Sequence, residues 1–157
     1  EDEIIVNVQG DEPFIEVDVV EAVINRVKQI KENNEDIMIT SCYKEISSSL
    51  ADDPNHVKVV LDEHSNAIYF SRAKVPYHRD HHENATYSGH LGIYGFTKKS
   101  LNAFCKLPSS KLENIEKLEQ LRAIDNGHKI AMVKVVSKSF GIDTQEDLNN
   151  ALKIFGK

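Results

Sequence analysis

The sequence is poor in the features that mark extracellular, membrane-spanning and nucleic-acid-binding proteins. Its 157 residues contain 2 cysteines, Cys42 and Cys105, which are far apart and form no Cys-x-x-Cys pair. Cysteines this sparse suit a reducing cytoplasm better than a disulfide scaffold. No apolar run approaches the length of a membrane span, and no signal peptide is visible. The net charge of -6 argues against broad binding to nucleic acids, which requires a basic face.

The sequence also lacks an initiator methionine. It begins at Glu1, and its 2 methionines are Met38 and Met132. Only Glu1, Asp2 and Glu3 precede an apolar run at Ile4–Val8 that is typical of a strand. A natural start usually places a frayed leader before the first buried strand. We therefore expect this chain to be part of a longer protein, and the preceding segment could carry half of the active site.

Hydrophobic periodicity predicts an α/β fold. With 40% hydrophobic residues, the chain can bury one ordinary core, so we expect residues 1–157 to form a single domain. Strands are expected at Ile4–Val8 (buried on both faces), Ile37–Cys42, Val57–Leu61, Ala67–Phe70, Gly89–Phe96 and Ile130–Val136. Helices are expected around Val20–Ile30 and Leu112–Arg122 and after Thr144. Strands and helices alternate, with one hairpin-rich insertion in the middle.

The helix expected at Leu112–Arg122 has a clear start. Ser110-Lys111-Leu112-Glu113 forms a capping box, and Gly127 suits the C-terminal cap. An apolar stripe is predicted from Leu112, Ile115, Leu118 and Leu121. Glu119 and Gln120 would then lie in mid-helix beside the stripe, where a solvated face is the simplest interpretation.

Two acidic residues are candidates for a metal site. Asp11 follows Gly10 at the end of the first apolar run, and Asp143 precedes the last expected helix. Carboxylates at the carboxyl ends of buried strands lie where open α/β sheets bind ligands, and a pair of them could hold a divalent cation against phosphates. Each also has an ordinary interpretation, Asp11 as a turn residue and Asp143 as a helix-start residue.

Further candidates follow other apolar runs. Arg72 could pair bidentately with a carboxylate, although a surface position is the simpler alternative. His90 and Tyr94 are predicted to share one strand face with Gly92, which leaves room for a ligand, although a half-exposed strand explains them equally well. The stretch His78–His82 contains histidines and an aspartate, but its polar context favours a solvated loop over a metal site.

Taken together, these segments resemble the 3-deoxy-manno-octulosonate (Kdo) cytidylyltransferases, the CMP-Kdo synthetases of Gram-negative bacteria. The similarity runs from Ile4 to about Leu152. It is carried by Val6–Pro13, Pro54–Val60, Tyr69–Ala73, His90–Phe96, Leu112–Arg122 and Gly141–Leu148. The strand His90–Phe96 and the helix Leu112–Arg122 are the most specific of these. Cytidylyltransferases for neuraminic acids share the fold but are less similar.

The resemblance implies a Rossmann-like mixed sheet of a nucleotidyltransferase and a reaction of lipopolysaccharide biosynthesis. In that reaction the anomeric hydroxyl of Kdo attacks the α-phosphate of CTP, so that CMP-Kdo forms and pyrophosphate leaves. Asp11 and Asp143 would ligate Mg²⁺, and Arg72 would meet the Kdo carboxylate. The remaining sugar contacts would come from Gln9, His90, Tyr94, Glu119 and Gln120. The family further implies a cytoplasmic homodimer, in which residues 72–96 form a dimerisation and sugar-binding insertion.

The chain departs from the family at its start. The family's first strand, its Gly- and Arg-containing phosphate loop and its cytosine-reading segment have no counterpart between Glu1 and Lys157, and the glycines are scattered. We therefore expect the isolated chain to be inactive and to need a preceding segment of the same protein. The alternatives are a non-catalytic truncated product that acts as a binding module, and a cytidylyltransferase for a related sugar acid such as 8-amino-Kdo or a neuraminic acid.

Overall fold

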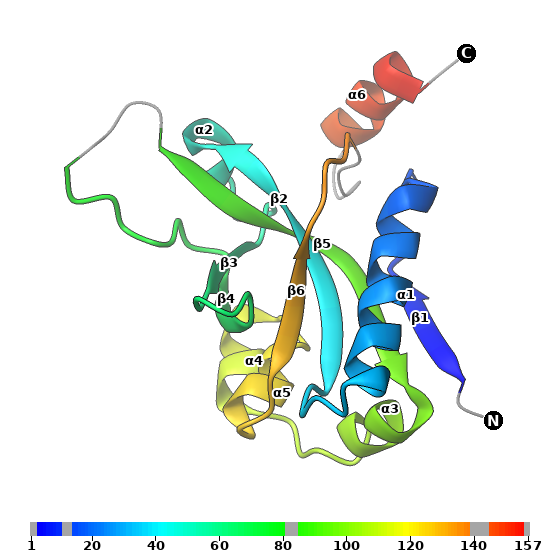
Figure 1. Ribbon diagram of the computed structural model, residues 1–157. Coiled ribbons are helices and arrows are strands. Elements are labelled where there is room, and N and C mark those ends of the chain that lie inside the picture. Colours follow the sequence, from blue (N-terminus) through cyan, green and yellow to red (C-terminus); the bar gives the residue numbers. More distant parts are fainter. Residues whose placement is uncertain (1–2, 11–13, 81–84, 139–144, 156–157) are drawn as a thin grey trace.

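The computed structural model describes residues 3–10, 14–80, 85–138 and 145–155. The strands are β1 (Ile4–Val8), β2 (Ile39–Ser47), β3 (Lys58–Leu61), β4 (Ala67–Ser71), β5 (Thr86–Thr97) and β6 (Ile130–Lys134). The helices are α1 (Val17–Glu32), α2 (Ser48–Ala51), α3 (Lys98–Phe104), α4 (Lys111–Glu116), α5 (Leu121–Asp125) and α6 (Gln145–Phe155). Strands and helices alternate towards both ends of the chain, and between these parts β3, β4 and β5 are followed by α3, α4 and α5 (Figure 1). Within these ranges, no helix is both long and apolar enough to cross a membrane.

The strands form one mixed sheet in the order β4-β3-β5-β2-β6, and β1 also pairs with β5. The β2–β6 pair is parallel and the other pairs are antiparallel. The α/β class and the mixed sheet are therefore as predicted. The predicted hairpin is present as β3 and β4. Residues 86–96, the second half of the expected insertion, belong to β5, so this part of the segment lies within the sheet.

The long strand β5 changes neighbours along one of its edges. One edge pairs with β2 from Thr86 to Gly95, whereas the other pairs with β1 at residues 93–97 and with β3 at Gly89. Backbone hydrogen bonds extend both contacts, from the Gln9 amide to Gly92 O and from the His90 amide to Val57 O. The sheet therefore forks along this edge of β5, between β1 and β3.

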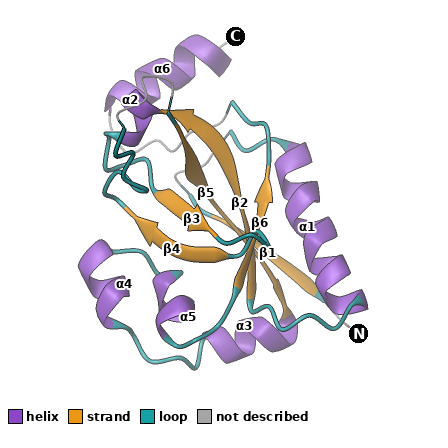
Figure 2. Cartoon of the chain, turned by 60° about the vertical axis from the view of Figure 1, so that its left-hand side comes forward, coloured by secondary structure: helices purple, strands orange, loops and turns teal. Residues whose placement is uncertain are grey.

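Helices cover the two faces of the sheet, with α1 on one side and α4 and α5 on the other (Figure 2). Val19 and Val23 of α1 pack on Leu91 and Ile93 of β5. On the opposite face, Phe70, Ile39, Ile130, Leu118 and Leu121 belong to a second apolar cluster. Side chains of β5 alternate between the faces, which confirms that His90, Gly92 and Tyr94 share one face.

Two predicted elements differ from the structure. The strand Ile4–Val8 was expected to be buried on both faces, but its side chains are half-buried or exposed. The reason is that β1 pairs antiparallel with β5 alone among the described strands. The helix expected at Leu112–Arg122 is two helices, because Lys117 takes the left-handed conformation (φ 56°) and ends α4. Ile115, assigned to the apolar stripe, is 65% exposed.

Candidate functional site

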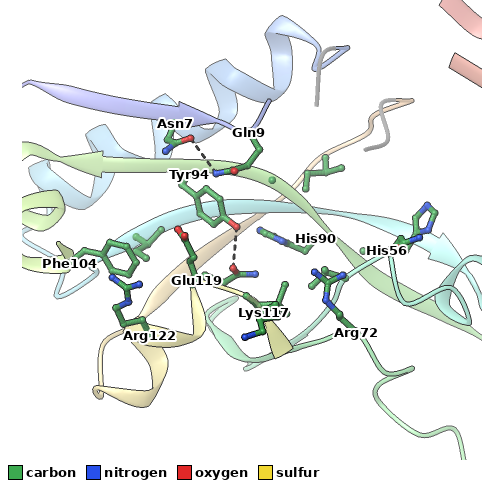
Figure 3. A pocket seen from close by; sticks show the side chains of 18 of the residues that line it. Asn7, Gln9, His56, Arg72, His90, Tyr94, Phe104, Lys117, Glu119 and Arg122 are labelled. Atoms are coloured by element: carbon green, nitrogen blue, oxygen red, sulfur yellow. Dashed lines mark hydrogen bonds between the residues drawn. The ribbon is translucent and has the colours of Figure 1, made fainter. Parts of the chain in front are cut away.

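A cavity of about 720 Å³ lies at the fork of the sheet. Its walls come from β1, the loop before β3, the segment after β4, β5, α3 and the turn between α4 and α5. In Figure 3, Tyr94 and His90 lie between Gln9 on one side and Arg72 and Lys117 on the other. Segments distant in sequence meet here because β5 has β1 and β3 as neighbours on the same edge.

Arg72 follows β4 and is held by backbone carbonyl groups. Its Nε donates to Glu116 O at 2.9 Å and its Nη1 to Pro54 O at 3.2 Å. Within the described ranges, no carboxylate forms an ion pair with its guanidinium. A guanidinium orientated by neutral groups keeps its charge available for an anion in the cavity.

Glu116, at the end of α4, fixes the backbone at Arg72. Its carboxylate accepts hydrogen bonds from the Arg72 amide at 3.0 Å and from Ser71 Oγ at 2.7 Å. Partial burial opposes ionisation, but these hydrogen bonds outweigh it and lower the pKa of Glu116. The carboxylate is therefore ionised at neutral pH and anchors the segment that carries Arg72.

Lys58 of β3 is a fully buried cation behind the same segment. Its Nζ donates to Asp53 O at 3.0 Å and to Arg72 O at 2.7 Å. Desolvation lowers the pKa of Lys58. Because Arg72 also bonds Pro54 O, Lys58 and Arg72 together tie the loop before β3 to the segment after β4.

His90 of β5 is partly buried in the cavity wall, with its ring 4.9 Å from Phe70 and 5.6 Å from Tyr94 between centroids. Its Nε2 lies 2.9 Å from Ser41 Oγ. Burial lowers the pKa of His90 to about 3, so its imidazole is neutral at neutral pH. The ring can therefore contribute hydrogen bonds to a ligand but no positive charge.

Glu119 and Gln120 lie in the turn between α4 and α5, not in mid-helix as predicted. The turn arises because Lys117 ends α4, and Glu113 of α4 is bound by Arg122 of α5 across it. Glu119 is exposed at the cavity, as a solvated residue would be. Gln120 is only 3% exposed, so the solvated-face interpretation is wrong for it.

Gln120 lines the cavity and has a buried, unsatisfied donor. Its Oε1 accepts a hydrogen bond from the Tyr94 hydroxyl at 3.2 Å, drawn in Figure 3, whereas its buried Nε2 has no partner in the part of the chain that the structure describes. An unpaired buried amide group is costly, typically about 1–3 kcal/mol.

The structure places six predicted residues around this one cavity. They are Gln9, Arg72, His90, Tyr94, Glu119 and Gln120. The proposed metal ligands Asp11 and Asp143 lie outside the described residues, as do His81 and His82. Among the residues that are described, no group of three or more His, Cys, Asp or Glu side chains could hold a metal ion. His78 packs its ring against Tyr87 at 5.0 Å.

Sequence reasoning missed the residues that support this wall. Lys58 alternates with valines in an apolar run, which gave no sign that its ammonium is buried, and Glu116 and Ser41 carried no motif. An apolar end of the cavity, formed by Phe96, Leu101 and Phe104, was also missed. The helix α3 supplies two of these residues and begins with a capping box in which Ser100 takes the usual place of Glu or Gln.

Comparison with known proteins identifies relatives over nearly the whole chain. The family model described as Cytidylyltransferase matches residues 1–130. The chain is 54% identical over 156 residues to the 3-deoxy-manno-octulosonate cytidylyltransferase of Wolinella succinogenes, covering 98% of this chain and 64% of the relative. It is 50% identical over 157 residues to the enzyme of that name from Helicobacter pylori, covering 98% and 62%. The chain thus spans less than two thirds of the length of these relatives.

A solved structure is also similar to this chain. It is that of CMP:2-keto-3-deoxy-manno-octonic acid synthetase complexed with CTP, with a TM-score of 0.82 and 34% sequence identity. The match covers 96% of this chain and 61% of that chain. The mixed sheet therefore has the fold of a nucleotidyltransferase, as predicted.

Proposed function

The chain belongs to the cytidylyltransferase family, and from this premise we propose that the protein containing it transfers a cytidylyl group from CTP to 3-deoxy-manno-octulosonate. In this reaction the anomeric oxygen of the sugar forms a bond to the α-phosphorus, and the bond from that phosphorus to pyrophosphate breaks. The hydroxyl proton is lost, and CMP-Kdo and pyrophosphate result. The relatives that carry this name support the proposal.

The observation that carries the proposal is the position of Arg72. Its guanidinium faces a cavity, is held by the carbonyls of Pro54 and Glu116, and has no ion-pair partner among the described carboxylates. Around it are the neutral polar groups of His90, Tyr94 and Gln120. A fixed cation beside neutral donors and acceptors suits a sugar acid, which has one carboxylate and several hydroxyls.

In this proposal the chain's own residues bind and orientate the sugar. Arg72 holds the carboxylate, Gln120 donates from Nε2 to a sugar oxygen, and Tyr94 fixes the amide of Gln120 from the other side. Gln9 and Glu119 line the cavity and would contact hydroxyls. Phosphoryl transfer depends chiefly on positioning and charge neutralisation, so a fixed sugar hydroxyl is a large part of what such a site must provide.

Steady-state kinetics with Arg72→Lys tests this assignment. In the full-length protein, pyrophosphate release is measured with CTP, Mg²⁺ and varied Kdo. An ammonium cannot reproduce the planar two-point grip on a carboxylate, so the KM for Kdo should rise about tenfold or more while the KM for CTP stays unchanged. An unchanged KM for Kdo would refute the carboxylate assignment. Lys106→Arg, a change at an exposed residue that follows α3, serves as the matched control.

We further propose Asp11 and Asp143 as ligands of Mg²⁺, which would neutralise charge on the phosphates. Both lie outside the described residues, so this proposal is supported by the family resemblance alone. Asp11→Asn and Asp143→Asn should abolish turnover in the full-length protein while leaving its unfolding transition in place. Retained turnover in either variant would exclude that residue as a ligand.

Three further proposals concern the whole protein. The sequence between Glu1 and Lys157 has no glycine-rich basic loop to cradle a triphosphate, so the isolated chain should release no pyrophosphate until the preceding segment is supplied.

The protein should form a homodimer through the segment at residues 72–96, and a monomeric mass by light scattering would contradict this. The third proposal is a location in the reducing cytoplasm, which suits a sequence with only 2 cysteines, Cys42 and Cys105.

A further inference from the structure

Ser41 is a buried hydroxyl that connects β2 to the cavity wall. It is fully buried and lies opposite Tyr94 in the β2–β5 ladder. Its Oγ is 2.8 Å from Ile93 O and 2.9 Å from His90 Nε2. The register shifts at this point, because Ser41 pairs with Tyr94 while Cys42 pairs with Leu91. The Ile93 carbonyl therefore lies at an interruption of the ladder, where a side-chain hydroxyl can reach it.

The two contacts of Ser41 determine where the hydrogen atoms are. A serine hydroxyl has a single hydrogen to donate, and a carbonyl oxygen can only accept. The hydrogen of Ser41 is therefore directed to Ile93 O, and Ser41 Oγ is left as an acceptor towards His90. To make that second hydrogen bond, Nε2 of His90 must carry a hydrogen. Because the imidazole is neutral at neutral pH, Nδ1 then carries none.

The opposite arrangement satisfies fewer groups. If Ser41 donated to Nε2, its hydrogen would no longer serve Ile93 O, and Nδ1 of His90 would carry a hydrogen. Nδ1 has no hydrogen-bond partner among the described residues, whereas Nε2 has Ser41. Buried polar groups are almost always paired, so the arrangement that satisfies both Ile93 O and Nε2 is favoured.

We propose that Ser41 is a positioning residue, which holds His90 in the Nε2–H tautomer so that Nδ1 accepts a hydrogen bond from a hydroxyl of the bound ligand. Naming that ligand as a sugar acid rests on the proposed function, whereas the tautomer does not. The cavity wall then contains both a hydrogen-bond donor, Gln120 Nε2, and a hydrogen-bond acceptor, His90 Nδ1. A ligand must offer an oxygen to the first and an O–H to the second.

Nitrogen NMR of histidine-labelled full-length protein tests the tautomer directly. His90 signals are assigned by their absence in His90→Asn. In the wild type, Nε2 should show a directly bonded hydrogen and Nδ1 a pyridine-type shift. Ser41→Ala removes the acceptor for Nε2–H, so the Nδ1–H form should become populated. A wild-type protein with the hydrogen on Nδ1, or a Ser41→Ala variant with the wild-type tautomer, would overturn the proposal.

Thr40→Val is the matched control. Thr40 is the preceding residue of β2, equally buried, and its Oγ1 has no partner in the described chain. It lies on the other face of the sheet, where it pairs with Gly95 beneath α1. Removing this hydroxyl should leave the His90 tautomer and ligand affinity unchanged. A tautomer change in Thr40→Val as large as in Ser41→Ala would show that any buried change in β2 suffices, and would refute a specific role for Ser41.

Calorimetric titration with Kdo connects the tautomer to binding. Loss of one hydrogen bond should weaken the affinity of Ser41→Ala for Kdo about tenfold. Wild-type affinity in a variant whose tautomer has changed would overturn the assignment of Nδ1 as the ligand's acceptor. If the full-length protein instead fails to release pyrophosphate from CTP and Kdo while the NMR result holds, the proposed function is wrong and the role of Ser41 in fixing the tautomer stands.

Discussion

The ion pair between Glu113 and Arg122 joins α4 to α5 across the turn that carries Glu119 and Gln120. Arg122 Nε donates to Glu113 Oε2 at 2.9 Å, and its Nη2 donates to Oε1. The same carboxylate accepts from the Ser110 amide at 3.1 Å. The two side chains are 22% and 10% exposed for Arg122 and Glu113 respectively, so water screens this pair less than a surface pair. We predict that Glu113→Gln destabilises the protein substantially.

The size of the effect follows from the pKa of Glu113. The hydrogen bond from Arg122 is the largest cause that lowers this pKa, from 4.5 to about 2. At about 1.4 kcal/mol for each pH unit, the ionised form gains roughly 3 kcal/mol on folding. Some of this is lost to solvent screening, so we expect Glu113→Gln to lower the free energy of unfolding by about 2–3 kcal/mol at pH 7.

The pH dependence has a definite sign. The folded pKa of Glu113 lies below the unfolded value, so its contribution is fully present above about pH 5 and is lost as the pH falls towards 2. The stability difference between wild type and Glu113→Gln should therefore shrink across this range. Urea unfolding followed by circular dichroism at several pH values measures it, because other carboxylates contribute equally to both proteins.

Glu45→Gln provides the matched control. Glu45 pairs with Lys134 at 3.1 Å, but the two side chains are 54% and 59% exposed, so this charge removal should change stability by less than about 1 kcal/mol. The reasoning is refuted if Glu113→Gln costs no more than Glu45→Gln at pH 7. It is also refuted if the cost of Glu113→Gln is the same at pH 2 as at pH 7.

Three further substitutions test other parts of the fold. Gly95→Ala would place its Cβ 2.6 Å from Val23 Cγ1 beneath α1. Thermal denaturation should therefore show a free energy of unfolding lower by about 1–3 kcal/mol. Wild-type stability would mean that α1 can move away freely. Lys58→Met leaves the carbonyls of Asp53 and Arg72 without their donor. It should lower the free energy of unfolding in urea by about 1–3 kcal/mol and also weaken Kdo binding. A variant with normal affinity for Kdo would show that Arg72 needs no support from Lys58. Lys117→Gly removes the strain of a side chain in the left-handed backbone region and should stabilise the protein by roughly 1 kcal/mol, seen as a higher midpoint of urea unfolding. A lower midpoint would show that the contacts of the lysine side chain matter more than the backbone strain.

Local periodicity predicted most strands and helices because it reflects burial on one face. The alternation in His90–Phe96 correctly placed His90 and Tyr94 together, since strand geometry leaves no other choice. The helix break at Lys117 was not predicted because the apolar spacing continues through it and no glycine marks it. The break is stabilised by tertiary contacts, the Glu113–Arg122 pair and the burial of Gln120, which a local pattern does not contain.

The residues that hold the candidate site in place were harder to predict than the residues that line it. A lysine in an alternating strand is normally expected to face water, yet Lys58 is buried. Its partners are backbone carbonyls from two separate loops, Asp53 O and Arg72 O. Backbone carbonyls are present at every position, so no residue type announces such a contact. Ser41 was missed because it too donates to a backbone carbonyl, Ile93 O. That carbonyl lies at a register shift between β2 and β5, which the sequence does not mark.

The fork beside β5 also makes the cavity a junction between segments that are far apart in the sequence. The Gln9 amide bonds Gly92 O at 3.1 Å on one branch, and the His90 amide bonds Val57 O at 2.8 Å on the other. A ligand that contacts both branches acts as a reversible cross-link, and at a concentration of 100 times its Kd it stabilises the closed junction by about 2.7 kcal/mol. Hydrogen exchange at these two amides should therefore slow together when such a ligand binds, so that the two amides report on occupancy of the whole site.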